Sequence, residues 1–372
     1  MLRMKKSKVF FIIPTLDGGG AERVFTIVLN HLDHIKYELY LVLLRKEGKF
    51  LTQVPDHVHI LSLNASRVLK AIPTLIRLTR LHKPDIIISG FLHVNLSILM
   101  LKWFFPSTTR IVVRETIVLS KHLRTLGKTE KVLLKLLIKW FYPLTNVIIC
   151  QSTDMRNDLM KEFGINNDKL TIIRNPVDVT SLQKIIEDNP IQLSRHRYKI
   201  VAMGRLTYQK GFDLLIKALA IVHEELNSVT LYLLGEGEEL DSLKKKVYQE
   251  GLAGCVEFLG FVENPYRYLA AADVMAFSSR YEGFPNAVIE SLACGTPVVA
   301  FNSPGGLNEI IVDDFNGWLV PEEDIQGFAK ALIEAKNKKL NRDRIVSDIN
   351  YRYNTASIIN QYDTLLTNLL QR

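Results

Sequence analysis

Short apolar runs rich in Val and Ile recur along the chain and alternate with segments whose apolar residues have helical spacing. This alternation predicts parallel β-sheets covered by helices on both faces, which is an α/β fold of Rossmann-like units. In the first half, strands are expected near Val9–Ile13, Glu38–Leu44, His59–Leu63, Asp85–Ser89, Arg110–Val113, Val147–Cys150 and Thr171–Ile173. In the second half, they are expected near Lys199–Met203, Thr230–Leu234, Val256–Leu259, Val274–Phe277, Val298–Phe301 and Trp318–Val320.

The length of 372 residues corresponds to two domains. We assign residues 1–178 to the first domain and 198–354 to the second. Residues 179–197 have mixed polar content, Pro190 and no clear strand, so we interpret them as a linker. Residues 355–372 predict a helix that packs back toward the first domain. Ligands of such sheets bind beyond the carboxyl ends of the strands, so two facing units would form a cleft where substrates meet.

The three cysteines, Cys150, Cys255 and Cys294, lie far apart, which offers neither a disulfide framework nor a zinc spacing. This pattern favours a reducing cytoplasm and no bound metal. The apolar run Val9–Pro14 after the basic start is too short for a signal peptide. Because no stretch of about 20 apolar residues exists, we expect no membrane span.

Positive charge is concentrated in the first half of the chain. Residues 1–180 contain 27 Lys and Arg against 14 Asp and Glu, whereas the remaining residues contain 20 against 25, for a net charge of +8 overall. A basic half indicates an anionic partner for one domain. A membrane surface, a phosphorylated substrate and nucleic acid all fit this requirement.

A segment with two cations between glycines, Gly204–Gly211, follows the expected strand Lys199–Met203 and opens a helical segment. Arg205 can bind phosphate oxygens bidentately, and Lys210 adds a point charge. The helix that begins at Gly211 favours an anion at its amino terminus. A solvated basic loop is the alternative, but surface cations are rarely bracketed by glycines at such a junction. The segment therefore predicts a diphosphate site.

Two glutamates, Glu282 and Glu290, are separated by seven residues across an expected loop and helix start. Pro285 suits the first turn of that helix, where its missing N–H is no loss. Glu290 then has apolar neighbours, among which a carboxylate needs hydrogen-bond partners. Ribose hydroxyls would serve Glu290, and sugar hydroxyls would serve Glu282. Taken alone, the pair is better explained by a solvated helix face.

Together the two motifs resemble those of the retaining glycosyltransferases of family 4. Members of that family share a Gly-Arg…Lys-Gly loop, matched by Gly204–Gly211, and a Glu-x7-Glu element, matched by Glu282 and Glu290. Four further matches extend the resemblance over nearly the whole chain: Gly18–Arg23, Arg174–Asp178, Cys294–Val299 and Gly305–Gly306. The resemblance implies the GT-B fold, in which two Rossmann-like domains face each other.

The resemblance also implies roles for single residues. Arg205 and Lys210 would hold the diphosphate of a nucleotide-sugar donor and stabilise the leaving group as the glycosidic bond breaks. Glu290 would bind the ribose, and Glu282 would lie near the donor sugar.

Phosphate contacts would also come from the backbone amides of Phe284 and Asn286. In the retaining mechanism usually proposed for the family, the acceptor attacks from the leaving group's own face and a departing phosphate oxygen takes its proton. The chain contains no Asp-x-Asp, the metal-binding pattern of other glycosyltransferases, so we expect no required metal or other cofactor.

The first half offers fewer candidate residues. Three glycines after the first expected strand would let the backbone approach the donor closely: Gly18, Gly19 and Gly20. His93 follows the fourth expected strand, where family members often place a polar group near the donor sugar, although a structural role is equally open. Arg114 and Glu115 follow the fifth expected strand and would face the same cleft, or form an ordinary salt bridge.

Six cations recur at spacings of three and four residues, which would place them on one helical face: Lys121, Arg124, Lys128, Lys131, Lys135 and Lys139. Leu133, Leu136 and Trp140 are among the apolar residues that flank them. A basic face beside Leu and Trp is typical of a helix that meets anionic lipid headgroups, although most such faces are merely solvated. The resembling proteins build capsules, O-antigens or polyprenyl-diphosphate-linked glycans from UDP-sugars. We therefore expect a lipid-linked or oligosaccharide acceptor and a peripheral position on the cytoplasmic face of the plasma membrane.

Other functions fit the sequence less well. The segment Gly235–Leu240 resembles a dinucleotide-binding fingerprint, but Leu240 replaces its third glycine and three glutamates would repel a pyrophosphate. A sugar-nucleotide enzyme of the same fold with another reaction, or a non-enzymatic basic membrane-binding protein, remains an alternative. We expect no nucleic-acid partner, because no stacking platform or nucleic-acid motif is present.

Overall fold

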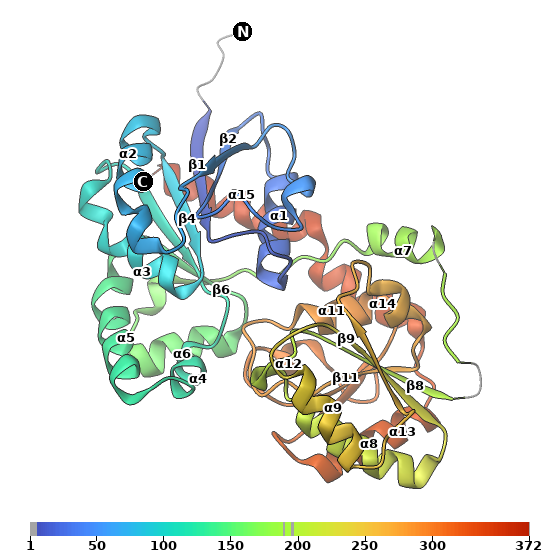
Figure 1. Cartoon of the computed structure of the whole chain (residues 1–372). Helices are drawn as coiled ribbons and strands as arrows, with labels where there is room; N and C mark the ends of the chain where they lie inside the picture. Colours follow the sequence, from blue (N-terminus) through green and yellow to red (C-terminus); the bar gives the residue numbers. More distant parts are fainter. Residues whose placement is uncertain (1–5, 189, 195–196, 372) are drawn as a thin grey trace. The chain divides into compact units, whose positions relative to one another are not determined.

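The computed structural model describes residues 6–188, 190–194 and 197–371 (Figure 1). The chain divides into two compact units. Unit 1 comprises Met1–Pro176 together with Thr355–Arg372, and unit 2 comprises Val177–Asn354. Each unit contains one parallel β-sheet with helices packed on both of its faces.

The sheet of unit 1 has seven strands in the order β3-β2-β1-β4-β5-β6-β7. The strands are β1 (Ser7–Ile13), β2 (Tyr37–Leu43), β3 (His59–Ser62), β4 (Ile86–Gly90), β5 (Arg110–Arg114), β6 (Val147–Cys150) and β7 (Leu170–Ile172). Two helices cover one face: α1 (Gly20–His31) and α15 (Thr355–Gln371). Five cover the other: α2 (Val68–His82), α3 (Leu92–Met100), α4 (Leu119–Arg124), α5 (Lys128–Phe141) and α6 (Thr153–Phe163). Short 3-10 helices are η1 (Leu51–Gln53), η2 (Lys102–Phe104), η3 (Tyr142–Leu144) and η4 (Asn167–Lys169).

The sheet of unit 2 has six strands in the order β10-β9-β8-β11-β12-β13. The strands are β8 (Tyr198–Met203), β9 (Val229–Leu234), β10 (Val256–Gly260), β11 (Val274–Phe277), β12 (Val298–Phe301) and β13 (Gly317–Val320). One face is covered by α8 (Phe212–Leu226), α9 (Leu240–Gln249) and α13 (Ile325–Asn337). The other is covered by α7 (Val179–Asp188), α10 (Tyr266–Ala271), α11 (Asn286–Ala293), α12 (Leu307–Ile310) and α14 (Arg342–Tyr353), and η5 (Tyr208–Lys210) precedes α8.

The predicted fold class is confirmed, and every expected strand is present within two residues of its expected bounds. The apolar runs were informative because most residues of the inner strands are buried, whereas the edge strands β3, β7 and β10 are only partly buried. The central strands β1 and β4 are the clearest case, since their apolar side chains are entirely enclosed.

The region interpreted as a linker differs from the expectation. Residues Val179–Asp188 form helix α7, and Val179 and Leu182 pack into the core of unit 2. Asp178 stabilises the first turn of this helix, because its carboxylate accepts hydrogen bonds from the Ser181 amide at 3.0 Å and the Ser181 hydroxyl at 2.6 Å. No strand occurs among the described residues of this region, as expected, but the amphipathic helical spacing was overlooked.

The C-terminal helix α15 returns to unit 1, where it packs beside α1 (Figure 1). Its apolar face is buried in the unit 1 core through Ile358, Tyr362 and Leu366. An ion pair of 2.9 Å between Lys36 and Asp363 links the same helix to the start of β2. Helix α15 is therefore an integral layer of unit 1.

The basic stripe does not lie on one continuous helix, as the spacing had suggested. Helix α4 ends at Arg124 and α5 begins at Lys128, because Gly127 adopts an extended conformation at the N-cap of α5. Lys121 and Arg124 therefore belong to α4, and the other four cations belong to α5: Lys128, Lys131, Lys135 and Lys139.

In both sheets the strand order reverses beside the first strand of the unit. The chain moves outward from β1 on one side and from β4 on the other, and β8 and β11 form the same pair in unit 2. Loops that leave the carboxyl ends of such a pair diverge, and the crevice between them is where ligands of open α/β sheets bind. In unit 2 these loops are Gly204–Gly211 and 278–285, which contain the two motifs found in the sequence.

Candidate functional site

The structure brings the two unit 2 motifs into direct contact. The Nζ atom of Lys210 lies 2.6 Å from Oε1 of Glu282, and the two side chains are only 20% and 10% exposed. Lys210 also lies over the ring of Phe277, at the end of β11, with Nζ 5.6 Å from the centroid. The lysine is thereby held at the carboxyl edge of the sheet, with its ammonium group at the reversal of strand order.

Two glycines make this arrangement possible. Gly204 has φ +152°, and the carbon chain of Lys210 lies against its α-carbon, where a Cβ would meet Lys210 Cε at 3.1 Å. Gly211 has φ +62°, and a Cβ there would lie 2.2 Å from the carbonyl oxygen of Ser278. A side chain at Gly211 would therefore separate the two loops. The glycines bracket the cations because the loops must approach each other closely.

Arg280 fixes the conformation of the cationic loop, which the sequence did not reveal. Its Nη1 donates to the carbonyl oxygen of Tyr208 at 2.7 Å, and its guanidinium forms a bidentate pair with Asp213 at 2.9 Å. The same group stacks on the Tyr208 ring at 4.0 Å. Since its guanidinium is already engaged by Tyr208 and Asp213, we interpret Arg280 as a positioning residue. Its place two residues before Glu282 was the available sequence signal.

Arg205 differs from Lys210 in its surroundings. Its side chain is exposed, and among the described residues no acceptor is assigned to its guanidinium. An exposed arginine at the carboxyl end of β8 can present its planar donor fork to an incoming anion without first breaking an internal bond.

Glu290, Phe284 and Asn286 lie in or just before α11, directly after the loop that carries Glu282. Phe284 is buried, and Glu290 is partly buried on the helix. Burial, together with the nearby Glu290 carboxylate, raises the pKa of the Cys294 thiol. The Asn286 amide already donates to the Phe284 carbonyl at 3.0 Å. In this conformation the Asn286 amide is therefore not free to donate a hydrogen bond to a phosphate.

The unit 1 candidates lie at the corresponding edge of the first sheet. Gly18 and Gly19 connect β1 to α1, which begins at Gly20. His93 is in the first turn of α3, after Phe91, whose φ of +72° is rare for an aromatic residue. Partial desolvation lowers the pKa of His93, although the residue remains exposed at the surface. His93 lines a pocket of unit 1 together with residues that follow β1, β2 and β3.

Arg114 and Glu115 are buried, at 1% exposure each, and do not face a cleft. Arg114 donates to the Tyr362 hydroxyl at 3.2 Å and to the Asn175 side chain at 2.6 Å. Glu115 accepts from Asn95 at 3.0 Å and from the Tyr142 hydroxyl. The expectation that they line the substrate cleft is therefore wrong, because their partners all come from the unit 1 interior.

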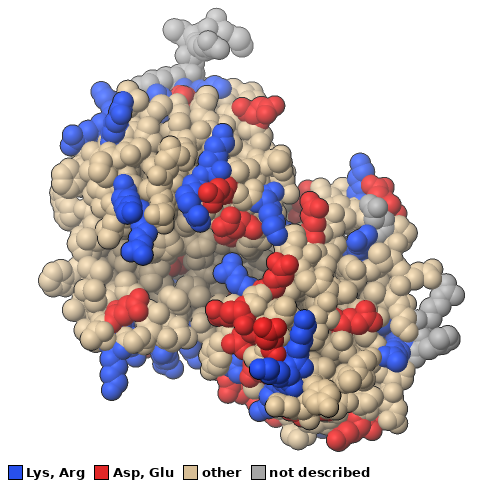
Figure 2. Space-filling model, viewed as in Figure 1, with Lys and Arg blue, Asp and Glu red and all other residues tan. Residues whose placement is uncertain are grey.

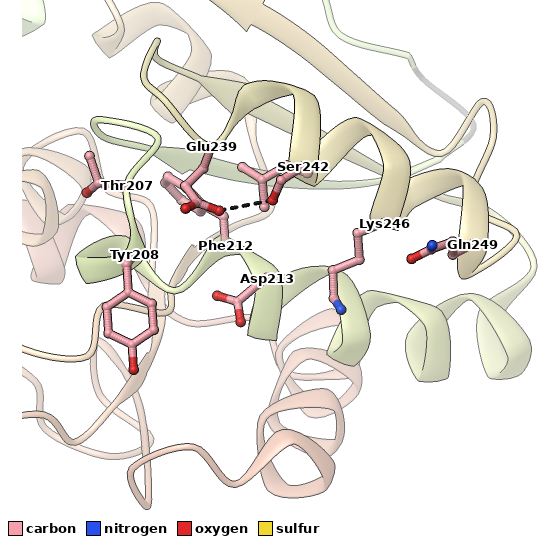
Figure 3. A pocket seen from close by; sticks show the side chains of 9 residues that line it. Thr207, Tyr208, Phe212, Asp213, Glu239, Ser242, Lys246 and Gln249 are labelled. Carbon is pink, nitrogen blue, oxygen red and sulfur yellow. Dashed lines mark hydrogen bonds between the residues drawn. The ribbon is translucent and has the colours of Figure 1, made fainter.

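A second pocket opens between α8 and α9 and is lined in part by the cationic loop (Figure 3). Its walls include Asp213, Glu239 and Lys246, and a 3.0 Å hydrogen bond joins Ser242 to Glu239. Two carboxylates against one lysine make this pocket a poor site for a diphosphate. Lys210 and Arg205, at the edge of the sheet, are therefore the stronger candidates to bind an anion in unit 2.

In the part of the chain that the structure describes, no group of three or more His, Cys, Asp and Glu side chains is placed to hold a metal ion. Every helix in that part is too short or too polar to span a lipid bilayer.

Comparison with known proteins identifies the family. A model described as Glycosyltransferase Family 4 matches residues 18–181, and one described as Glycosyl transferases group 1 matches residues 184–350. A Campylobacter jejuni protein is 31% identical over 92% of this chain and 94% of its own length. The chain belongs to glycosyltransferase family 4. That relative is named N-acetylgalactosamine-N,N'-diacetylbacillosaminyl-diphospho-undecaprenol 4-alpha-N-acetylgalactosaminyltransferase. The family 4 protein described here is accordingly a glycosyltransferase enzyme.

Further relatives agree with this family 4 assignment. An amylovoran biosynthesis glycosyltransferase of Erwinia amylovora is 25% identical over 85% of this chain and 86% of its own length. The solved structure of Anabaena HepE in complex with UDP-glucose has a TM-score of 0.79 at 21% identity, and covers 97% of this chain and 99% of its own. Sucrose-phosphate synthase from Thermosynechococcus elongatus has a TM-score of 0.82 at 16% identity, with coverage of 98% and 100%. At these identities the two structures establish the GT-B fold.

Proposed function

We propose that this glycosyltransferase moves a hexose or N-acetylhexosamine from a UDP-sugar to a lipid-linked or growing glycan in cell-surface polysaccharide biosynthesis, with retention of anomeric configuration. The observation that carries the proposal is the position of Lys210 and Arg205 at the reversal of strand order in unit 2. The donor finds support in the UDP-bound Anabaena structure. The diphospho-undecaprenol in the name of the Campylobacter relative supports the acceptor.

In this proposal, four charged residues of unit 2 each have a part in the reaction. Lys210 and Arg205 neutralise the charge that grows on the diphosphate as the bond between the anomeric carbon and the phosphate oxygen breaks. Glu282 holds the Lys210 ammonium in place and stands next to the donor sugar, while Glu290 receives the ribose hydroxyls. The acceptor hydroxyl attacks the anomeric carbon on the face that the diphosphate leaves, and its proton passes to a phosphate oxygen.

The donor assignment can be tested by thermal stability. UDP at concentrations well above its dissociation constant should raise the melting temperature, since a ligand that binds only the folded state stabilises it. NAD and a short oligonucleotide at the same concentrations should leave the melting temperature unchanged. A shift with NAD and none with UDP would reject the proposed donor in favour of the dinucleotide alternative.

We further propose that catalysis requires no metal ion, because two cationic side chains already stand where a divalent ion would neutralise the diphosphate. Sugar transfer measured in excess EDTA should therefore match the rate without chelator. Loss of activity in EDTA that returns on adding Mg²⁺ or Mn²⁺ would overturn this proposal.

We also propose that unit 1 rests on an anionic membrane through helix α5. One face of the helix packs inward through Leu134, Leu137 and Ile138, and its four lysines form a second, basic face. Between them lies an exposed apolar face formed by Val132, Leu133, Leu136 and Trp140, the last of which is 73% exposed. On the visible face of unit 1 in Figure 2, blue Lys and Arg are more prominent than red Asp and Glu, whereas red groups are more frequent on unit 2. An exposed apolar face beside lysines is the arrangement of an interfacial helix.

Replacing Lys128, Lys131 and Lys139 with glutamate should release the protein from anionic vesicles, because each lysine near such a surface contributes about 1 kcal/mol. Lys135 is left unchanged, since it pairs with Glu162 at 3.5 Å within the unit. Sedimentation with vesicles of anionic lipid measures the effect. The control replaces the exposed Lys244, Lys245 and Lys330 of unit 2 with glutamate, for the same change in net charge. Equal vesicle binding by the two variants would show that the α5 stripe is merely solvated.

A further inference from the structure

Unit 1 contains a pocket that the reaction described above does not use. Its volume is about 380 Å³, and it lies where the strand order of the first sheet reverses. Its walls come from loops that leave the carboxyl ends of four neighbouring strands. Thr15 follows β1, Arg45 follows β2, Arg67 follows β3, and His93 follows β4. In an open α/β sheet this is the position at which a ligand is expected.

The charge of the pocket selects an anion. Arg45 and Arg67 both line it, and none of the described lining residues is a carboxylate. Glu47 lies outside the pocket and forms an ion pair with Arg45 at 3.3 Å. Both side chains are about half exposed, so this ion pair is weak and an incoming anion can replace Glu47. Asp17 accepts a hydrogen bond from the Thr15 hydroxyl at 2.6 Å. Arg67, at the N-cap of α2, is exposed and has no assigned acid partner among the described residues.

Neutral polar groups complete the polar wall. His93 lies in the first turn of α3 and lines the pocket, where its imidazole N–H can donate a hydrogen bond. The Ser97 hydroxyl donates to the His93 carbonyl at 2.8 Å, which ties it to the helix. Two guanidinium forks and an imidazole N–H suit the several oxygens of a phosphate.

The opposite wall is apolar. Val68 and Leu69 begin helix α2 next to Arg67, and Leu69 is 74% exposed although it lines the pocket. An exposed leucine close to an exposed arginine in one pocket suits a ligand that has an anionic group joined to a hydrocarbon. Inorganic phosphate has no hydrocarbon part that could contact this apolar wall.

We propose that this pocket binds the phosphate or diphosphate group of a lipid-linked acceptor, with Arg45 and Arg67 on its oxygens and Leu69 against the first carbons of its lipid. The inference rests on the proposed function, and it assigns acceptor phosphate to this pocket and not to the lysines of α5. The α5 stripe then serves the membrane surface, while the pocket selects the acceptor molecule.

Binding of farnesyl diphosphate and of inorganic diphosphate, measured by calorimetry with UDP present at saturation, tests the assignment. UDP occupies the unit 2 diphosphate site, so remaining binding reports on unit 1. Replacing Arg45 and Arg67 with glutamine should weaken the binding of both probes by about 10- to 100-fold, since charge-assisted contacts are lost. A control variant, Arg77→Gln with Lys161→Gln, removes two exposed charges of unit 1 outside the pocket and should bind as the wild type does.

The two probes separate the sources of the phosphate. Leu69→Gln should weaken farnesyl diphosphate several-fold and leave inorganic diphosphate unchanged. Equal affinities for the two probes in the wild type would assign the pocket to a free anion and overturn the lipid-linked acceptor. Unchanged binding in the double arginine variant, or no binding to the wild type, would overturn the site itself. A separate titration of the wild type with UDP alone tests the donor half of the proposed function, so the two failures are distinguishable.

Discussion

Replacing Lys210 with alanine is expected to lower the rate of sugar transfer by about 10² to 10³, which is the usual effect of removing one charge-stabilising group from a transition state. The physical reason is its position: the ammonium group stands at the reversal of strand order, fixed by Glu282 at 2.6 Å. Arg205→Ala and Glu290→Ala should have effects of similar size. Initial rates with saturating donor and acceptor give the measurement.

The Lys210 variant also leaves the Glu282 carboxylate without its cation, so a loss of stability must be separated from a loss of catalysis. Lys199 provides the matched control in the same unit. It pairs with Asp273 at 3.1 Å and is 21% exposed, close to the 20% of Lys210, but it lies at the start of β8, away from the site. Lys199→Ala should lower the melting temperature and keep the rate. A folded Lys210→Ala protein with near wild-type turnover would remove Lys210 from the reaction.

The sequence was sufficient to predict the strands of both sheets but not the bounds of every helix. Strands such as β1 and β8 are continuous apolar runs bounded by polar loops, a pattern that few other structures produce. The break between α4 and α5 was missed because lysine spacing continues through Gly127, and its effect depends on the backbone conformation of a single residue. Helix α7 was missed because its polar composition hid an apolar face that unit 2 covers.

In the site, the sequence indicated the residues and the structure supplied their contacts. Gly204–Gly211 and Glu282 were recognised from glycines and charges, and the prediction that they act on one donor remains a proposal. Their ion pair could not be predicted, because it depends on the close approach of loops far apart in the chain. Arg280 was missed for the same reason: its partners Tyr208 and Asp213 are some 70 positions away.

Arg114 and Glu115 were misjudged because position after a strand does not distinguish a cleft from an interior. Both are enclosed, and Arg114 joins β5 to helix α15 through Tyr362. Replacing Arg114 with methionine is expected to lower the free energy of unfolding by about 1 to 3 kcal/mol at pH 8, because it removes the charged donor from the buried Asn175 and Tyr362 oxygens and the positive charge near Glu115. Chemical denaturation at pH 8 measures this loss. Adding Glu115→Gln to the Arg114→Met variant should recover part of the lost stability. If the free-energy change of the double variant equals the sum of the two single changes, Arg114 and Glu115 are not energetically coupled.

Glu115 should also make the stability of the wild type depend on pH. Burial raises the pKa of Glu115 from 4.5 to about 7, against the opposing effects of Tyr142, Asn95 and Arg114. The folded chain therefore holds this proton more tightly than the unfolded chain does. The cost of ionising Glu115 is absent below pH 4.5, grows as the pH rises toward 7, and is complete above it.

Glu115→Gln removes this titration and keeps an oxygen for Tyr142 and Asn95, so its melting temperature relative to the wild type should rise steadily from pH 5 to pH 8. The exposed Glu224 of α8 supplies the control, since Glu224→Gln removes the same charge where water already solvates it. Its difference from the wild type should stay flat over that range. If Glu115→Gln instead loses stability as the pH rises, the ionised carboxylate is a net stabilising partner of Arg114, and burial is not what governs this group.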